Sequence, residues 1–121
     1  MQITKDKQNN ILILRLGADI KSGKATGEIE LDIDNNYIYT EEVEKAIGIG
    51  EVKLLIDLSN ISYIDSSGLG AIFDSYKLVS DKNGSIILLN PSTDVKRVLD
   101  ITQISKKIKV VVDENEALES F

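Results

Sequence analysis

The chain contains no cysteine, no histidine and no tryptophan, and it has a single proline. Without cysteine there is no disulfide scaffold, no thiol nucleophile and no zinc site with cysteine ligands. Without histidine there is no imidazole base for a Ser-His or Cys-His pair, and the commonest transition-metal ligand is missing. These absences exclude much of known enzyme chemistry, so we expect no catalytic residues, no metal and no cofactor.

Positive charge and long hydrophobic runs are also scarce. The 14 Lys and Arg residues against 20 Asp and Glu give a net charge of −6. This balance argues against nucleic acid as a partner, because binding phosphates requires a basic face. Apolar runs such as Ile86–Leu89 are far shorter than the roughly 20 residues that cross a bilayer, and Met1–Asn10 lacks the apolar centre of a signal peptide. We therefore expect a cytoplasmic protein that does not enter a membrane.

Short apolar runs bounded by Gly, Asn or Pro predict buried strands. Four of them are evident, and a fifth strand at the N-terminus would pair with the first: Ile11–Leu16, Val52–Leu58, Ser85–Asn90, Ile108–Val112 and Met1–Thr4. With 42% hydrophobic residues, this chain of 121 residues suits one globular domain.

Helical patterns separate these strands. Residues 69, 72, 73, 76 and 79 form one apolar stripe, which predicts a helix that starts after Asp65-Ser66-Ser67 and stops at Asn83-Gly84. Three further helices are predicted: Thr40–Ile47, a helix after Pro91 capped by Ser92 or Thr93 with Val95, Val98 and Leu99 inward, and Asn115–Phe121. Alternation of strands and helices predicts an α/β sheet with crossover connections.

Residues 21–39 interrupt this alternation. Polar and apolar residues alternate over Glu28–Asp34, and Asn35-Asn36 precede Tyr37–Tyr39. Alternation with a double Asn at the bend is a hairpin signal. We predict a two-stranded hairpin insertion near residues 21–39, a surface addition with Ile29, Leu31 and Ile33 facing the body of the protein.

Two motifs resemble binding loops but are incomplete. In Gly17–Thr26 the spacing of a phosphate-binding loop fails, and Ala25 stands where a Ser or Thr must bind Mg²⁺. Asp32-x-Asp34-x-Asn36 begins like a calcium loop, but Tyr37 replaces the required Gly and Val43 replaces the closing Glu. We interpret the first as ordinary turn chemistry and the second as a solvated polar strand face with a bend.

The acidic side chains show no catalytic pairing. Asp57, Asp65 and Asp74 have no partner base in the sequence, and no two of them form a pair that the sequence can assign to glycoside hydrolysis. We expect them to face solvent.

Asp65-Ser66-Ser67-Gly68-Leu69-Gly70 is the most informative segment. Asp65, Ser66 or Ser67 can cap the following helix by accepting hydrogen bonds from its free N–H groups. Two adjacent serines exceed what one cap requires, however, and each Gly costs about 1 kcal/mol relative to Ala in a helix. The small residues suggest that another surface approaches closely here.

The run Leu54–Gly70 resembles the STAS domain, specifically that of bacterial anti-sigma-factor antagonists. The resemblance continues through the following helix, through Val95–Ile104 and through Ile108–Leu118. It implies a STAS-type fold: a small, mixed, mostly parallel β-sheet with helices packed on it, in a single domain over residues 1–121.

The chain departs from the family pattern in three places. The family usually follows its early strand with Gly-Glu-Ile/Leu-Asp, and either Asp19 or Glu30 matches that Asp here. The family's long first helix is predicted to be short, over Thr40–Ile47. Gln103 stands where the family often has Gly. These departures bear on the identity of the partner more than on the fold.

The resemblance implies partner switching without enzymatic activity. An anti-sigma factor that is also a serine kinase binds the unphosphorylated antagonist and phosphorylates the first serine after the motif Asp, which is Ser66 here. A serine/threonine protein phosphatase reverses the modification. The implied partner-binding residues are Asp65, Ser67, Gly68, Leu69 and Gly70. The alternative is a STAS scaffold or regulatory subunit of a stress-sensing, lipid-transport or anion-transport complex.

Overall fold

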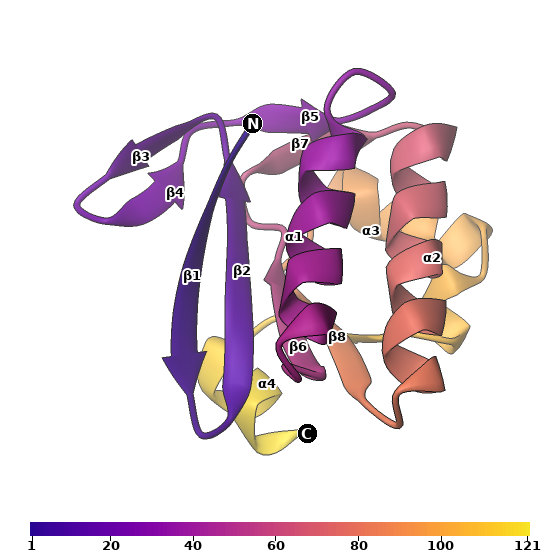
Figure 1. Cartoon of the computed structure of the whole chain (residues 1–121). Coiled ribbons are helices and arrows are strands. Elements are labelled where there is room, and N and C mark those ends of the chain that lie inside the picture. The colour runs from indigo at the N-terminus through magenta and orange to yellow at the C-terminus, as the bar shows by residue number, and fades with distance from the viewer.

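Strand β2 (Ile11–Gly17) is buried along its whole length, and it lies inside the main sheet of the protein. The computed structural model describes all 121 residues (Figure 1). The other strands of this sheet are β1 (Gln2–Gln8), β6 (Lys53–Asp57), β8 (Ser85–Leu89) and β9 (Lys109–Val111). Their order is β1-β2-β6-β8-β9, with β1 antiparallel to β2 and the remaining pairs parallel. The mixed, mostly parallel sheet is therefore confirmed, as are the five predicted strands.

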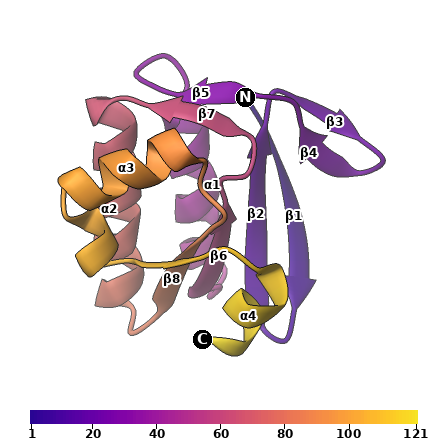
Figure 2. The same ribbon diagram turned by 180° about the vertical axis from the view of Figure 1, so that it is seen from behind.

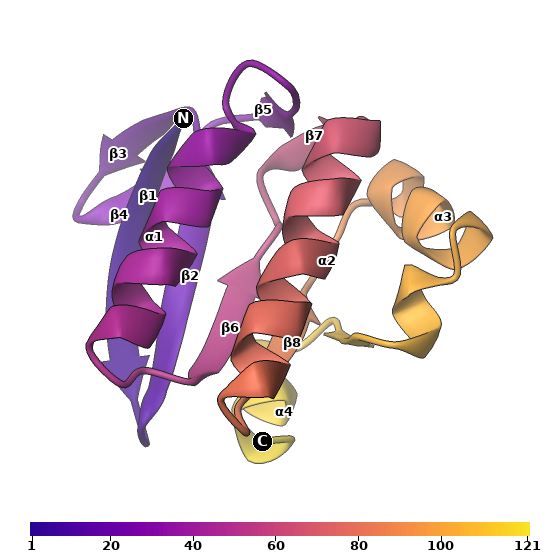
Figure 3. The same ribbon diagram turned by 45° about the vertical axis from the view of Figure 1, so that its right-hand side comes forward.

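Helices cover both faces of the sheet. They are α1 (Asn36–Gly48), α2 (Ser66–Asp81), α3 (Thr93–Ile101) and α4 (Glu114–Glu119), with a 3₁₀ turn, η1 (Ile104–Lys106), after α3. Helices α1 and α2 lie side by side on one face (Figure 3), whereas α4 covers the other near the C-terminus (Figure 2).

Successive residues of a strand point to opposite faces, so β2 contributes to two hydrophobic cores. Leu12, Leu14 and Leu16 belong to the larger core beneath α1, α2 and α3. Ile11 and Ile13 belong to a smaller core that Ala117 of α4 closes.

The hairpin prediction for residues 21–39 is wrong in its position. A hairpin is present, but it joins β3 (Asp19–Lys21) and β4 (Lys24–Thr26), which enclose Ser22-Gly23. Strand β5 (Ile29–Leu31) instead pairs in parallel with β7 (Ile61–Ile64), and the expected second strand is the first turn of α1.

The cause lies in the side chains of the Asp32–Asn36 turn. The side-chain Oδ1 of Asn35 accepts a hydrogen bond from the Asp32 N–H at 2.9 Å, and the Asn36 N–H donates to the Asp32 carbonyl at 2.9 Å. These bonds start a helix where alternation favoured a strand. They also replace the polar strand face expected over Asp32–Asn36.

This segment is not a surface addition. Leu31 and Tyr39 are fully buried in the larger core, whereas Ile33, expected to face inward, is 75% exposed. Helix α1 begins four residues before the predicted helix, so the first helix is longer than expected.

The end of α2 lies as predicted, but its two turn residues have different tasks. Asn83 takes the left-handed backbone conformation, with φ of 58°. Gly84 does not have a positive φ, but it lies against the residue before β6, where a Cβ would be 2.1 Å from the Val52 carbonyl oxygen. Gly84 is thus required by close packing and not by its backbone angles.

Arg15 on β2 connects distant parts of the chain on the side of the smaller core. Its guanidinium donates hydrogen bonds to Asp6 of β1 at 3.0 Å, to Asp57 of β6 at 3.0 Å and to Glu114 of α4 at 2.7 Å. The Glu114 bond, supported by those to Asp6 and Asp57, raises the pKa of Arg15 above its ordinary value although burial acts in the opposite direction. The expectation that Asp57 faces solvent is wrong. Its carboxylate is buried and accepts a hydrogen bond from the guanidinium of Arg15, which is buried as well.

We expect Arg15→Met to destabilise the protein by about 3 kcal/mol, because it leaves buried Asp57 without its cation. This value is the lower end of the loss measured when a buried ion pair is broken, because two of the three carboxylates, those of Asp6 and Glu114, are 38% and 36% exposed and contribute less. Urea unfolding measures the loss. Arg97→Met is the matched control, because the pair between Arg97 and Asp94 is exposed; its effect should stay within about 0.5 kcal/mol. A loss below about 1 kcal/mol for Arg15→Met would contradict the assignment.

Candidate functional site

Asp65 organises the N-terminus of α2. Its Oδ1 accepts hydrogen bonds from the Gly68 N–H at 2.8 Å and from the Ser67 hydroxyl at 2.6 Å. Its Oδ2 accepts from the Ile33 N–H at 3.1 Å, which ties the loop after β5 to the helix. The bond from Ser67, followed by that from Gly68, lowers the pKa of Asp65. The predicted cap is therefore confirmed and belongs to Asp65.

The two serines of the motif have different environments. Ser67 is half-buried; its hydroxyl donates to Asp65 and accepts a hydrogen bond from the Asn36 side chain at 3.2 Å. Ser66 is exposed, and its hydroxyl makes no hydrogen bond within the protein. Ser66 therefore presents a free hydroxyl group at the start of a helix.

The two glycines of the motif differ as well. Gly68 is buried, and a Cβ there would be 2.5 Å from the carbonyl oxygen of Leu31. The close surface that the small residues predicted is thus, at Gly68, the backbone of β5 in the same chain. Gly70 is exposed and has no neighbour within 4 Å of an added Cβ. Gly68 supports the exposed surface from beneath, whereas Leu69 and Gly70 help to form it.

A groove of about 550 Å³ lies along this surface, between α2 and the segment after α3. Figure 3 shows this segment, which carries η1, alongside α2. Four lining residues lie on one face of α2 and five lie on Thr102–Lys107: Ser66, Leu69, Gly70 and Phe73, then Thr102, Gln103, Ile104, Lys106 and Lys107. We name this feature the α2–η1 groove.

Sequence analysis missed most of the groove. The spacing of Ser66, Leu69, Gly70 and Phe73 places them on one helical face, so this wall could have been found. No local pattern connects it with Thr102–Lys107, which begins 29 residues after Phe73. Gln103 has a φ of 65°, a left-handed conformation that Gly adopts without strain.

The structure also distinguishes the two candidate upstream acids. Glu30 lies in β5 beside Leu31, whose carbonyl accepts a hydrogen bond from the Asp65 N–H at 3.3 Å. Asp19 pairs with Thr26 in the β3–β4 hairpin, on the far side of the protein from α2 (Figure 1). Glu30 is therefore the acid near the motif.

The other segments that resembled binding loops, and the remaining acidic residues, form no site in the structure. Gly17–Thr26 forms the end of β2 and the β3–β4 hairpin. No three acidic side chains are grouped so as to hold a metal ion. Asp74 is exposed on α2, as expected. None of the helices combines the length and the apolar character needed to cross a membrane.

The fold and this site together describe a small mixed α/β domain with an exposed serine at the start of α2. The chain belongs to the STAS domain family, whose model matches residues 2–117. It is 30% identical to the anti-sigma-B factor antagonist of Bacillus subtilis, over 80% of this chain and 92% of that protein. The solved structure of TM1081 from Thermotoga maritima superposes with a TM-score of 0.81 at 26% identity, over 97% of this chain and 92% of that one.

A further structural neighbour is the anti-sigma factor antagonist SpoIIAA in its unphosphorylated form. Its TM-score is 0.75 at 22% identity, with 98% of this chain and 94% of that chain covered. The Bacillus protein has also been solved in its phosphorylated form, with a TM-score of 0.69. At this identity the likeness concerns the fold alone.

The two glycines provide a matched pair of substitutions. Gly68→Ala should destabilise the protein by about 1–3 kcal/mol, because its Cβ meets the rigid backbone of β5. Gly70→Ala should stabilise it by about 0.5–1 kcal/mol, because α2 gains helix propensity without a clash. Urea unfolding of both variants measures the difference. Equal effects at the two positions would show that β5 does not constrain the first turn.

The lowered pKa of Asp65 predicts a dependence of stability on pH. The folded state favours the carboxylate, so Asp65 contributes stability above its unfolded pKa of about 3.9 and loses it as the pH falls through the folded pKa. We compare wild type with Asp65→Asn, which removes the charge and keeps a side-chain oxygen. At pH 6 the variant should have a lower thermal unfolding midpoint than wild type. Below about pH 4 the difference between the two midpoints should become smaller. A gap that does not change with pH would exclude the charge as the stabilising factor.

Proposed function

We propose that this protein is an anti-sigma factor antagonist regulated by phosphorylation of Ser66. In its unphosphorylated form it binds an anti-sigma factor that is also a serine kinase, which frees the sigma factor. Phosphorylation releases the antagonist, and a serine/threonine protein phosphatase resets it. In this proposal residues 1–121 act as one cytoplasmic domain that is a substrate and a switch, not an enzyme.

One observation carries the proposal: Ser66 is exposed with a free hydroxyl, whereas Ser67 is held by Asp65 and Asn36. A kinase needs an accessible hydroxyl, and of the two serines only Ser66 offers one without breaking a hydrogen bond to Asp65. The family relationship supports the same reading, because the Bacillus subtilis relative is an anti-sigma-B factor antagonist.

The position of Ser66 explains how phosphorylation can change binding without unfolding the protein. A phosphoserine adds about −1.5 to −2 charges at pH 7. The free N–H groups and the dipole at the start of α2 favour an anion there. A partner packed over Leu69 and Gly70 would instead have to desolvate the phosphate next to the Asp65 carboxylate.

The test of the phosphorylation site needs the kinase, which is recovered by pull-down with the Ser66→Ala protein as bait. We expect a kinase of the histidine-kinase-like ATPase fold. Ser66→Asp should weaken kinase binding by about 1–3 kcal/mol while the thermal midpoint stays nearly unchanged. Ser66→Ala should bind and escape phosphorylation. Ser67→Ala should still be phosphorylated and lose about 1 kcal/mol of stability with its hydrogen bond to Asp65.

Peptide mass spectrometry after incubation with kinase and ATP locates the phosphate. Modification of Ser66 supports the proposal. Phosphate on Ser67 alone, or on neither serine, would overturn it.

A further inference from the structure

The α2–η1 groove extends well beyond Ser66. Its apolar part consists of Leu69, Phe73 and Ile104. Lys107 also borders a second hollow that Tyr76 and Ser80 line farther along α2. Tyr76 lies ten residues after Ser66, or roughly 15 Å along a helix. Ser66 thus stands at one end of the groove, and Lys107 lies toward the other.

The charge of the groove is opposite to that of the whole chain. The protein carries a net charge of −6, but the groove lining includes two lysines and no carboxylate. Lys106 and Lys107 are exposed and form no ion pair, unlike Lys5, Lys7, Lys45 and Lys96.

One further cation lies beside the groove, and the two neighbouring carboxylates are either already bound or outside its lining. Lys77 of α2 lies over the Phe73 ring, with its Nζ 4.9 Å from the ring centroid. Asp100, at the end of α3, is already bound to Lys96 and to the Ser105 hydroxyl. The carboxylate closest in sequence to Phe73, that of Asp74, is exposed on α2 and does not line the groove.

We propose that the α2–η1 groove is a docking site for an acidic segment of the partner that carries one or two large apolar side chains. The apolar side chains would lie on Leu69, Phe73 and Ile104, and the carboxylates would face Lys106 and Lys107. An acidic segment is repelled by most of this acidic chain, so the basic end of the groove also directs where it binds.

The proposal rests on the proposed function for the nature of the partner, and it adds a reason for release. A docked acidic segment reaches along the groove toward Ser66. A phosphate at that end places like charge beside the segment, so the same electrostatics that favour docking oppose it after phosphorylation.

The test uses the unphosphorylated full chain and a display library of random 12-residue peptides. The enriched peptides should carry net negative charge and at least one Leu, Ile, Phe or Trp. Lys106→Glu/Lys107→Glu should weaken the best peptide at least tenfold. Enrichment of neutral or basic peptides, or of none, would overturn the proposal, as would lysine-dependent self-association of the chain in place of peptide binding.

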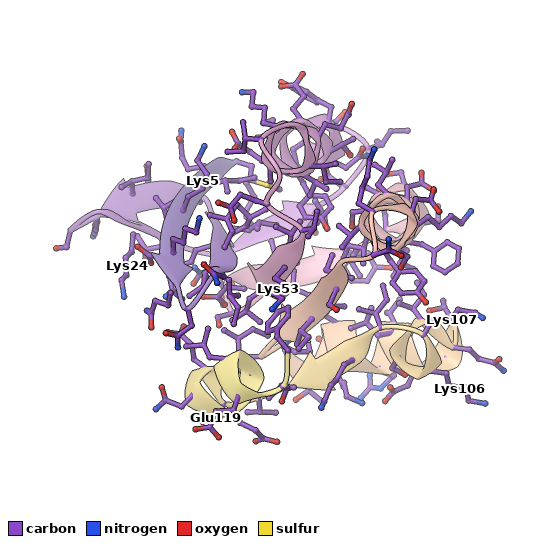
Figure 4. All side chains as sticks on the ribbon, turned by 60° about the horizontal axis from the view of Figure 1, so that its bottom comes forward. Lys5, Lys24, Lys53, Lys106, Lys107 and Glu119 are labelled. Atoms are coloured by element: carbon purple, nitrogen blue, oxygen red, sulfur yellow. The ribbon has the colours of Figure 1, made fainter.

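Lys24→Glu/Lys53→Glu is the matched control. Both variants replace two exposed lysines by glutamates and therefore have the same net charge. Lys24 and Lys53 lie apart from Lys106 and Lys107, which occupy one edge of the molecule (Figure 4). The control should keep peptide affinity within threefold. Equal losses of peptide affinity in the two variants would show that only the overall charge of the protein matters, and would refute a specific site.

Ser66→Asp separates this proposal from the phosphorylation switch. If both proposals hold, Ser66→Asp should weaken binding of the same peptide about fivefold or more. If only the variant at Lys106 and Lys107 loses binding, the groove stands and the switch at Ser66 fails. If only Ser66→Asp loses binding, the switch stands and the groove proposal fails.

Discussion

The site depends on one close contact, that between the first turn of α2 and the backbone of β5. Gly68 lies so near the Leu31 carbonyl that no side chain fits between them, and Asp65 holds the same loop through the Ile33 N–H. This contact determines the orientation of the helix start. Because Gly68 and Ser67 face the protein, Ser66, Leu69 and Gly70 face outward, where a partner can reach them.

Asp65 combines stability with exposure of the site. Its carboxylate accepts a hydrogen bond from the Gly68 N–H, which would otherwise be free at the helix start, and another from the Ser67 hydroxyl. The hydroxyl of Ser66 is left without a partner. A single capping residue thus turns two adjacent serines into one structural and one accessible group.

Much of the fold could be predicted from local patterns. The apolar runs of β2, β6 and β8 are short and continuous, which is typical of strands buried on both faces. The apolar stripe from Leu69 to Val79 and the turn at Asn83-Gly84 likewise predicted α2 from local sequence. The prediction was wrong at Glu28–Tyr39, where β5 is only three residues long and the side chains of Asp32, Asn35 and Asn36 favour a helical turn over alternation. It was also wrong at Asp57, because its partner Arg15 lies 42 residues away.

The sequence by itself determined the class of fold, the motif Asp65–Gly70 and the absence of histidine and cysteine chemistry, because each is a property of composition or of residues close along the chain. Only the tertiary structure decided which serine is free, why Gly68 is required, which of Asp19 and Glu30 lies near the motif, and that Thr102–Lys107 forms the second wall of the groove. Apart from the local bond between Asp65 and Ser67, these features depend on contacts between segments about 30 or more residues apart. Such contacts follow from the packing of whole elements, which leaves no periodic signal in either segment alone.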